Sequence, residues 1–199
     1  MNMNDRRNLI ICGLTFTAAM TAAAAVGLIH LPAGSFDPGN PQTTLTEIED
    51  TVSTRSPVPE ITDKMLRPAL SDPNTLTFDV REPEEYKQSH LAGAHRVDPG
   101  MSAADFFARY GNEIKGKLVV FYCAAGVRSG EFLTRIQPAI AGRGVKAAAN
   151  LRGGIFRWYA NGGQVVNDNG PASSVHPFDP EWAKLLERTL KTTPGAPKP

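Results

Sequence analysis

Cys123, one of two cysteines in the chain, directly follows the continuous apolar run Leu118–Tyr122. Such a run is typical of a parallel strand that is buried on both faces, so Cys123 is expected at the carboxyl end of a central strand. Ligands of open α/β sheets bind beyond that edge of the sheet. This position favours a nucleophilic cysteine, while a buried structural cysteine is the alternative. The candidate loop after it consists of Ala124, Ala125, Gly126, Val127, Arg128 and Ser129.

This loop has three features that stabilise a negative charge. A helix is expected to begin near Ser129, a good N-cap, and its first backbone N–H groups would then point at the loop. Gly126 lets the backbone curl toward the sulfur without a Cβ clash, and Arg128 adds a permanent cation. Helix N-termini and nearby cations favour the thiolate, which is the nucleophilic form of cysteine. The pattern therefore predicts covalent catalysis on an anionic substrate.

Strand and helix signals alternate over residues 60–190, which we interpret as the folded domain. The alternation predicts an α/β domain with a mostly parallel sheet. A proline at position 138 is expected to stop the helix that follows the Cys123 loop. The strands are expected at residues 75–80, 93–97, 118–122 and 145–151, and the helices at 84–88, 103–110, 130–137, 155–160 and 181–190.

The remaining segments are interpreted from composition. Residues 9–29 carry no charge and follow Arg6 and Arg7. A helix of this length reaches about 30 Å, the thickness of a bilayer core, so residues 1–34 are expected to be a signal peptide or transmembrane anchor. Periplasmic or other extracytoplasmic placement follows from that expectation, with cleavage and export route left open. Residues 35–59 are expected to be a flexible linker and 191–199 a disordered tail.

Composition also excludes several classes of function. The chain has 199 residues, of which 41% are apolar and 21% charged, enough for one packed domain with appendages. A net charge of +1 argues against broad nucleic-acid binding. Two cysteines exclude a disulfide-rich scaffold and a Cys₄ metal site.

Three separated segments resemble the signatures of the single-domain rhodaneses, a sulfurtransferase family. The first runs over residues 78–86 and on through 90–94, and the second is the loop from Cys123 to Ser129. The third is Leu151-Arg152-Gly153-Gly154, followed by Trp158 and Gly162-Gly163. Together they span about residues 60–167. The resemblance implies the rhodanese-like fold, in which a five-stranded, mostly parallel sheet is flanked by helices on both faces.

The resemblance also implies a reaction. Cys123 would take the sulfane sulfur from a small anionic donor such as thiosulfate, carry it as a persulfide, and pass it to cyanide or to a thiol, possibly a protein thiol. Backbone N–H groups of residues 124–129 would hold the persulfide's charge, and Arg128 would help hold the donor. No metal or organic cofactor is implied. Ala124, Ala125 and Val127 are neutral where thiosulfate-specialised members place cations, so the natural donor stays open.

Two alternatives remain beside this function. Related phosphatases and arsenate reductases have five residues between cysteine and arginine, but four lie between Cys123 and Arg128, which favours a single sulfur atom over a tetrahedral oxyanion. The second alternative is a non-catalytic persulfide carrier or thiol sensor that docks on a partner protein. Near the site, Asp79 and Arg81 are expected to form a buried ion pair that supports the loop. The resemblance implies that His90 is structural, and no acidic or cysteine cluster indicates a metal site.

Overall fold

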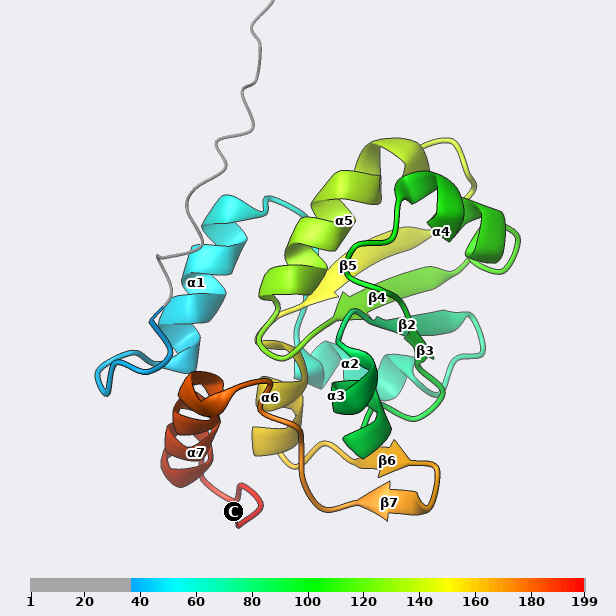
Figure 1. The fold of residues 1–199 in the computed structure, drawn as a ribbon. Coiled ribbons are helices and arrows are strands. Elements are labelled where there is room, and N and C mark those ends of the chain that lie inside the picture. The colour runs from blue at the N-terminus through cyan, green and yellow to red at the C-terminus, as the bar shows by residue number, and fades with distance from the viewer. Residues whose placement is uncertain (1–36, 199) are drawn as a thin grey trace, which may run out of the picture. The chain divides into compact units, whose positions relative to one another are not determined.

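The computed structural model describes residues 37–198, which are organised around a five-stranded sheet in the order β1-β5-β4-β2-β3 (Figure 1). Every pair of neighbours in this sheet is parallel, as the sequence predicts. The central strand is β4, which pairs with β5 on one side and β2 on the other. The strands are β1 (Glu60–Ile61), β2 (Thr75–Asp79), β3 (His95–Arg96), β4 (Leu118–Tyr122) and β5 (Ala147–Leu151).

Helices cover both faces of the sheet, which confirms the predicted fold class. Side chains of α4 and α5 pack on one face, and those of α1, α6 and α7 belong to the cluster on the other face. A separate antiparallel pair, β6 (Val165–Asn167) and β7 (Gly170–Ala172), follows α6. The helices are α1 (Leu45–Arg55), α2 (Asp63–Ala69), α3 (Pro83–Gln88), α4 (Ala103–Tyr110), α5 (Val127–Ile140), α6 (Gly154–Ala160) and α7 (Pro180–Thr192).

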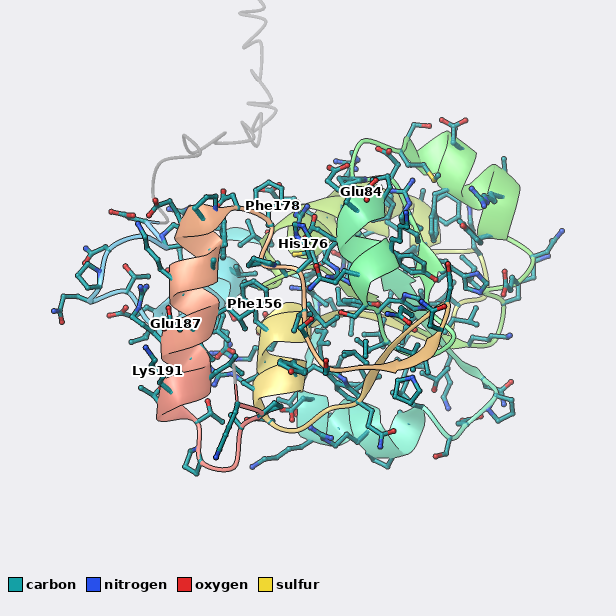
Figure 2. The ribbon with its side chains drawn as sticks, turned by 60° about the horizontal axis from the view of Figure 1, so that its bottom comes forward. Glu84, Phe156, His176, Phe178, Glu187 and Lys191 are labelled. Carbon is teal, nitrogen blue, oxygen red and sulfur yellow. The ribbon has the colours of Figure 1, made fainter. Side chains whose placement is uncertain are left out.

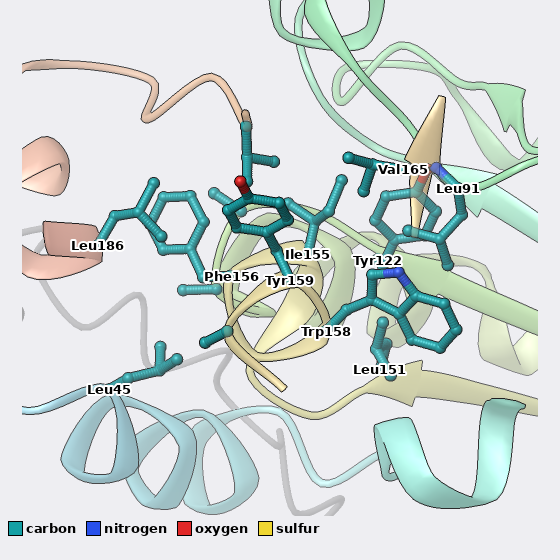
Figure 3. Packing of buried hydrophobic residues seen from close by; sticks show 14 of the residues in the cluster. Leu45, Leu91, Tyr122, Leu151, Ile155, Phe156, Trp158, Tyr159, Val165 and Leu186 are labelled. Carbon is teal, nitrogen blue, oxygen red and sulfur yellow. Dashed lines mark hydrogen bonds between the residues drawn. The ribbon is translucent and has the colours of Figure 1, made fainter. Parts of the chain in front are cut away.

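The apolar run of β4 is explained by these two layers. Successive side chains of a strand point to opposite faces, so a strand between two helical layers must be apolar on both. Val119 and Phe121 lie in the cluster under α4 and α5, whereas Val120 and Tyr122 lie in the cluster under α6. Figure 3 shows the second cluster, with Tyr122 beside the side chains of α6. Burial on both faces fixes the direction in which β4 presents Cys123.

The expectation of a flexible linker over residues 35–59 is wrong, because α1 forms within it. Leu45, Ile48 and Val52 recur at helical spacing and are buried. The helix begins with a capping box: the Thr44 side chain accepts a bond from the Glu47 N–H at 3.2 Å, and the Glu47 carboxylate accepts one from the Thr44 N–H at 2.8 Å. The polar composition of the segment concealed this periodicity, and β1 and α2 were missed as well.

Two further boundaries differ from expectation. Helix α5 begins at Val127 and continues past Pro138, which lies in its last turn and so removes little of the helix. Helix α7 extends through Thr192, and Ala196 packs partly buried against the core, so residues 191–196 are not a disordered tail. The predicted export segment, residues 1–34, lies outside the described residues. Within residues 37–198, no helix is long and apolar enough to cross a membrane.

Candidate active site

Cys123 lies directly after β4, at the predicted edge of the sheet, and the residue is 1% exposed. The backbone N–H of Gly126 donates a hydrogen bond to its sulfur at 3.2 Å. The carbonyl groups of Cys123 and Ala124 instead accept bonds from the first amides of α6, those of Ile155 and Phe156, at 2.9 and 3.0 Å. The loop therefore directs carbonyl oxygens to α6 and at least one amide donor to the sulfur.

Two glycines allow this close arrangement. Gly126 has a φ of 94°, in the left-handed region that side chains disfavour. Gly154, the first residue of α6, has a φ of 55°, and a Cβ there would lie 2.4 Å from the carbonyl oxygen of Cys123. Any side chain at position 154 would thus push α6 away from the loop. The packing of α6 against the loop depends on this glycine.

Ser129 does not cap α5 as expected, because the helix begins two residues earlier with Gly126 as its N-cap. Ser129 is fully buried, and its hydroxyl donates to the Asn150 side-chain oxygen at 2.7 Å. The Asn150 amide in turn donates to the Gly126 carbonyl at 3.0 Å. Asn150 therefore holds the loop from β5. It was not identified from the sequence, although a lone polar residue in a predicted buried strand is a usable signal.

Arg128, which the resemblance expects to help hold the donor, is paired in the structure. Its two terminal nitrogens donate to the two carboxylate oxygens of Glu85 in α3, at 2.7 and 2.8 Å. The Glu85 side chain is 2% exposed and the Arg128 side chain 22% exposed. Burial would lower the pKa of Arg128, but hydrogen bonds and charge interactions with Glu85 and with the Cys123 sulfur raise it above its ordinary value. The guanidinium therefore lies by the sulfur with its charge balanced by Glu85.

Asp79 and Arg81 form the expected ion pair, and it is fully buried. Arg81 donates from Nε and Nη2 to the two Asp79 oxygens at 2.8 and 2.7 Å, and from Nη2 to the Ser89 carbonyl at 2.6 Å. This pair joins the end of β2 to the turn after α3, the helix that carries Glu85. The pair thus holds in place the segment that positions Glu85. It is buried and has no exposed surface with which to contact a substrate.

The two histidines near the first signature have structural partners. His90 stacks on Tyr86 with ring centroids 3.9 Å apart, and its Nδ1 lies 2.9 Å from the Tyr86 carbonyl oxygen. His95 pairs with Glu113 at 3.1 Å. Within the part of the chain that the structure describes, no three His, Cys, Asp or Glu side chains gather to hold a metal ion.

A residue far from the predicted loop also reaches the site. Phe178, in the segment between β7 and α7, places its ring against the Arg128 guanidinium, with 4.6 Å from Cζ to the ring centroid. Figure 2 shows Phe178 and His176 on this segment. Phe178 has a φ of 78° and is 43% exposed. Nothing in the local sequence indicates this contact, because it joins positions fifty residues apart, 128 and 178.

The arrangement is suited to nucleophilic chemistry at sulfur. A strand end, a glycine turn and a buried Ser129–Asn150 bond fix the loop, and an amide and a guanidinium lie beside the sulfur. Preorganised donors of this kind stabilise charge that develops on an attacking or departing atom.

Comparisons with known proteins show which family and which proteins the chain is similar to. Residues 62–161 match the family described as "Rhodanese-like domain". The chain is 32% identical over 106 residues to the thiosulfate:glutathione sulfurtransferase of Saccharomyces cerevisiae, covering 48% of this chain and 73% of that protein. It is also 32% identical over 106 residues to a tRNA uridine(34) hydroxylase of Oceanobacillus iheyensis, covering 50% of this chain but 32% of the hydroxylase. The crystal structure of a Pseudomonas aeruginosa thiosulfate sulfurtransferase is similar at 18% identity and a TM-score of 0.48, covering 77% of this chain and 27% of that one.

Proposed function

This chain belongs to the rhodanese-like domain family, and we propose on that premise that it is a sulfurtransferase that uses a persulfide on Cys123. The donor would carry a sulfane sulfur, as thiosulfate does, and the acceptor would be cyanide or a thiol, including a protein thiol. The observation that carries the proposal is the Gly126 N–H bond to the Cys123 sulfur, in a loop held by α6 and by Asn150.

The proposed cycle has two displacements. The Cys123 thiolate attacks the outer sulfur of thiosulfate, the S–S bond of the donor breaks, and sulfite leaves with the bonding electron pair. The enzyme then carries Cys–S–S⁻. An acceptor nucleophile attacks the outer sulfur of this persulfide, which yields thiocyanate from cyanide or a new persulfide from a thiol and restores the Cys123 thiolate.

The loop fits this intermediate for two reasons. The four residues between Cys123 and Arg128 form a shorter ring than a phosphate-binding loop, which suits one additional sulfur atom. The Gly126 amide and the Arg128 guanidinium lie beside the position where the negative charge resides in both the thiolate and the persulfide. Donors that are already oriented need no reorganisation when the charge moves outward by one atom.

The test is the conversion of thiosulfate and cyanide to thiocyanate by the full-length protein. Cys123→Ser is expected to abolish thiocyanate formation and the one-sulfur mass increase on the protein. Cys12→Ser, which removes the other cysteine of the chain, is the matched control and is expected to keep both. Unchanged activity of Cys123→Ser would contradict the mechanism.

The low exposure of Cys123 supports a second candidate function. Cys123 is 1% exposed, and docking of a partner protein could open a path for an acceptor to its sulfur, as in a persulfide carrier or thiol sensor. Turnover separates the two functions. An enzyme produces many equivalents of thiocyanate, whereas a carrier accepts one sulfur and stops until its partner is added.

We further propose an extracytoplasmic location, either exported or tethered to the membrane by residues 9–29. The uncharged stretch after Arg6 and Arg7 supports it. A periplasmic reporter enzyme fused after residue 60 is expected to be active outside the cytoplasm. A reporter that is active only in the cytoplasm would contradict this location.

A further inference from the structure

The segment that carries Phe178 is held in place along its length. We call residues 173–179, which join β7 to α7, the strap. The Tyr159 hydroxyl donates to the Ser173 carbonyl, the Gln88 side chain donates to the Ser174 hydroxyl at 3.2 Å, and Val175 is buried in the core. At its far end, Asp179 caps α7 by accepting bonds from the first backbone amides of that helix. The strap is therefore held against the rest of the fold by hydrogen bonds and by a buried side chain.

Phe178 occupies a strained position within the strap. Its φ of 78° is the only positive value of a residue other than glycine among the described residues. The Phe178 N–H donates to Nδ1 of His176 at 3.0 Å, which stabilises this backbone turn. A bulky residue in the left-handed region is strained, and such strain concentrates at functional positions. Here the strained backbone directs an exposed aromatic ring to Arg128.

Three groups interact with the Arg128 guanidinium. Glu85 takes its two terminal nitrogens, the Cys123 sulfur lies beside it, and the Phe178 ring covers one of its faces. Glu85 and Phe178 leave less of the guanidinium open to an incoming sulfonate, since the Arg128 side chain is 22% exposed. The other side chains of the loop, Ala124, Ala125 and Val127, offer no charge or hydrogen-bond donor. The surroundings of Arg128 therefore offer an exposed aromatic ring and a charge already balanced by Glu85, which favours an organic group over a small dianion.

We propose that Phe178 is a specificity-determining residue that favours organic persulfide donors, R–S–SH, over thiosulfate. The inference rests on the proposed function, since it concerns the donor for the same cysteine. The organic group R would pack against the exposed part of the Phe178 ring and the partly exposed side chain of Val127. The strap lies outside the region that matches the family, residues 62–161, so this selection is an addition carried by this chain.

The donor step balances with such a persulfide. The Cys123 thiolate attacks the terminal sulfur of R–S–SH, a new S–S bond forms at Cys123, and the S–S bond of the donor breaks. The thiolate R–S⁻ leaves with the bonding electron pair, and the proton stays on the transferred sulfur. No external oxidant or reductant is needed, and no sulfonate has to be bound.

The experiment measures how fast Cys123 is loaded from two donors, cysteine persulfide and thiosulfate. Loading is followed by mass spectrometry of the full-length protein in a single turnover, with Cys123→Ser as the background. Phe178→Ala is expected to raise the loading rate from thiosulfate about fivefold and to lower that from cysteine persulfide about threefold, the scale of one aromatic contact to a cation or an apolar group.

Two control variants accompany it. Phe178→Tyr keeps the ring and is expected to keep the wild-type ratio of the two rates. Met65→Ala removes the other large hydrophobic side chain that is exposed among residues 37–198, at 60% exposure, and is expected to leave both rates unchanged. Equal changes for both donors in Phe178→Ala would overturn the role of Phe178 while Cys123 still loads. Failure of the wild-type protein to load from either donor would overturn the proposed function itself.

Discussion

Two bidentate arginine–carboxylate pairs lie near the site, and they differ in what surrounds them. Asp79 and Arg81 are two residues apart in the chain, and both side chains are fully buried. Glu85 and Arg128 are 43 residues apart and join α3 to α5, with part of the arginine exposed and Phe178 on its face. The first pair has no route to a ligand. The second pair holds a positive charge beside the sulfur. Because Arg128 is partly exposed, a ligand or a neighbouring side chain can alter how far Glu85 neutralises that charge.

Pairing alone does not distinguish a structural arginine from a functional one. A buried charge requires its partner, because an uncompensated charge in the protein interior is strongly destabilising. A partly exposed arginine can exchange its protein carboxylate for an anionic ligand, because breaking an exposed ion pair costs less free energy than breaking a buried one. The position of the pair relative to solvent and to Cys123 decides which description applies.

The largest expected effect comes from breaking the buried pair. Arg81→Ala leaves Asp79 charged and unpaired in the core, so the free energy of unfolding is expected to fall by about 3–5 kcal/mol. Urea denaturation followed by circular dichroism measures this. Lys191→Ala removes one member of an exposed pair on α7 and is the control, expected to leave the denaturation midpoint almost unchanged. If Arg81→Ala lowered the free energy of unfolding only slightly, the buried pair would not differ from the exposed pair in its contribution to stability.

An intermediate effect is expected when the second pair is broken. Glu85→Gln removes the carboxylate from Arg128, and the free energy of unfolding is expected to fall by about 1–3 kcal/mol. The freed guanidinium should bind the donor's sulfonate, so the KM for thiosulfate should fall roughly tenfold. Glu84→Gln alters the exposed neighbour on the same helix and serves as the control. A rise in KM with Glu85→Gln would show that Glu85 positions Arg128 for the donor instead.

The smallest effect at neutral pH concerns Tyr122, which lies beneath Arg81 with 5.9 Å from Cζ to the ring centroid. Burial, with the nearby Asp79 charge, raises the pKa of Tyr122 well above its usual value of 10.0. The folded protein thus holds this proton more tightly than the unfolded chain. The contribution of protonated Tyr122 to the free energy of unfolding is fully present below about pH 10. It is lost as the pH rises toward the pKa of Tyr122 in the folded protein.

Alkaline denaturation tests this dependence. The free energy of unfolding of the wild-type protein should fall above about pH 10, by at most about 1.4 kcal/mol per pH unit for each such tyrosine. Tyr122→Phe cannot ionise and should flatten the curve. At neutral pH it loses one hydrogen bond, from the Leu91 N–H at 3.0 Å. If the free energy of unfolding of Tyr122→Phe fell equally steeply with pH, the pH dependence would come from other groups.

The sequence predicts the parts of this molecule that depend on local periodicity. The apolar run of β4 and the spacing of Phe106, Phe107 and Tyr110 in α4 reflect how each element is buried, so both were located correctly. Helix α1 was missed because its polar residues outnumber the three apolar ones that pack. The position of Cys123 could be predicted because it directly follows β4. The loop after it could be predicted from Gly126 and the small residues around it.

The environment of Arg128 could not be predicted in the same way. Its partners come from α3 and from the strap, and no spacing in the sequence relates these segments. Asn150 is similar, since its role depends on the register that places β5 beside β4, with Asn150 opposite Phe121. Sequence patterns specify which face of an element is buried, but pairs between distant elements follow from the assembled fold.

The location of the strap has a consequence for how this protein could change over generations. The nucleophile and its loop lie within residues 62–161, while the aromatic ring that covers Arg128 belongs to residues 173–179. If Phe178 selects the donor as we propose, reactivity and donor choice are encoded in separate stretches of the gene. A lineage could acquire a new sulfur source by exchanging seven codons, with the chemistry of the cysteine left intact.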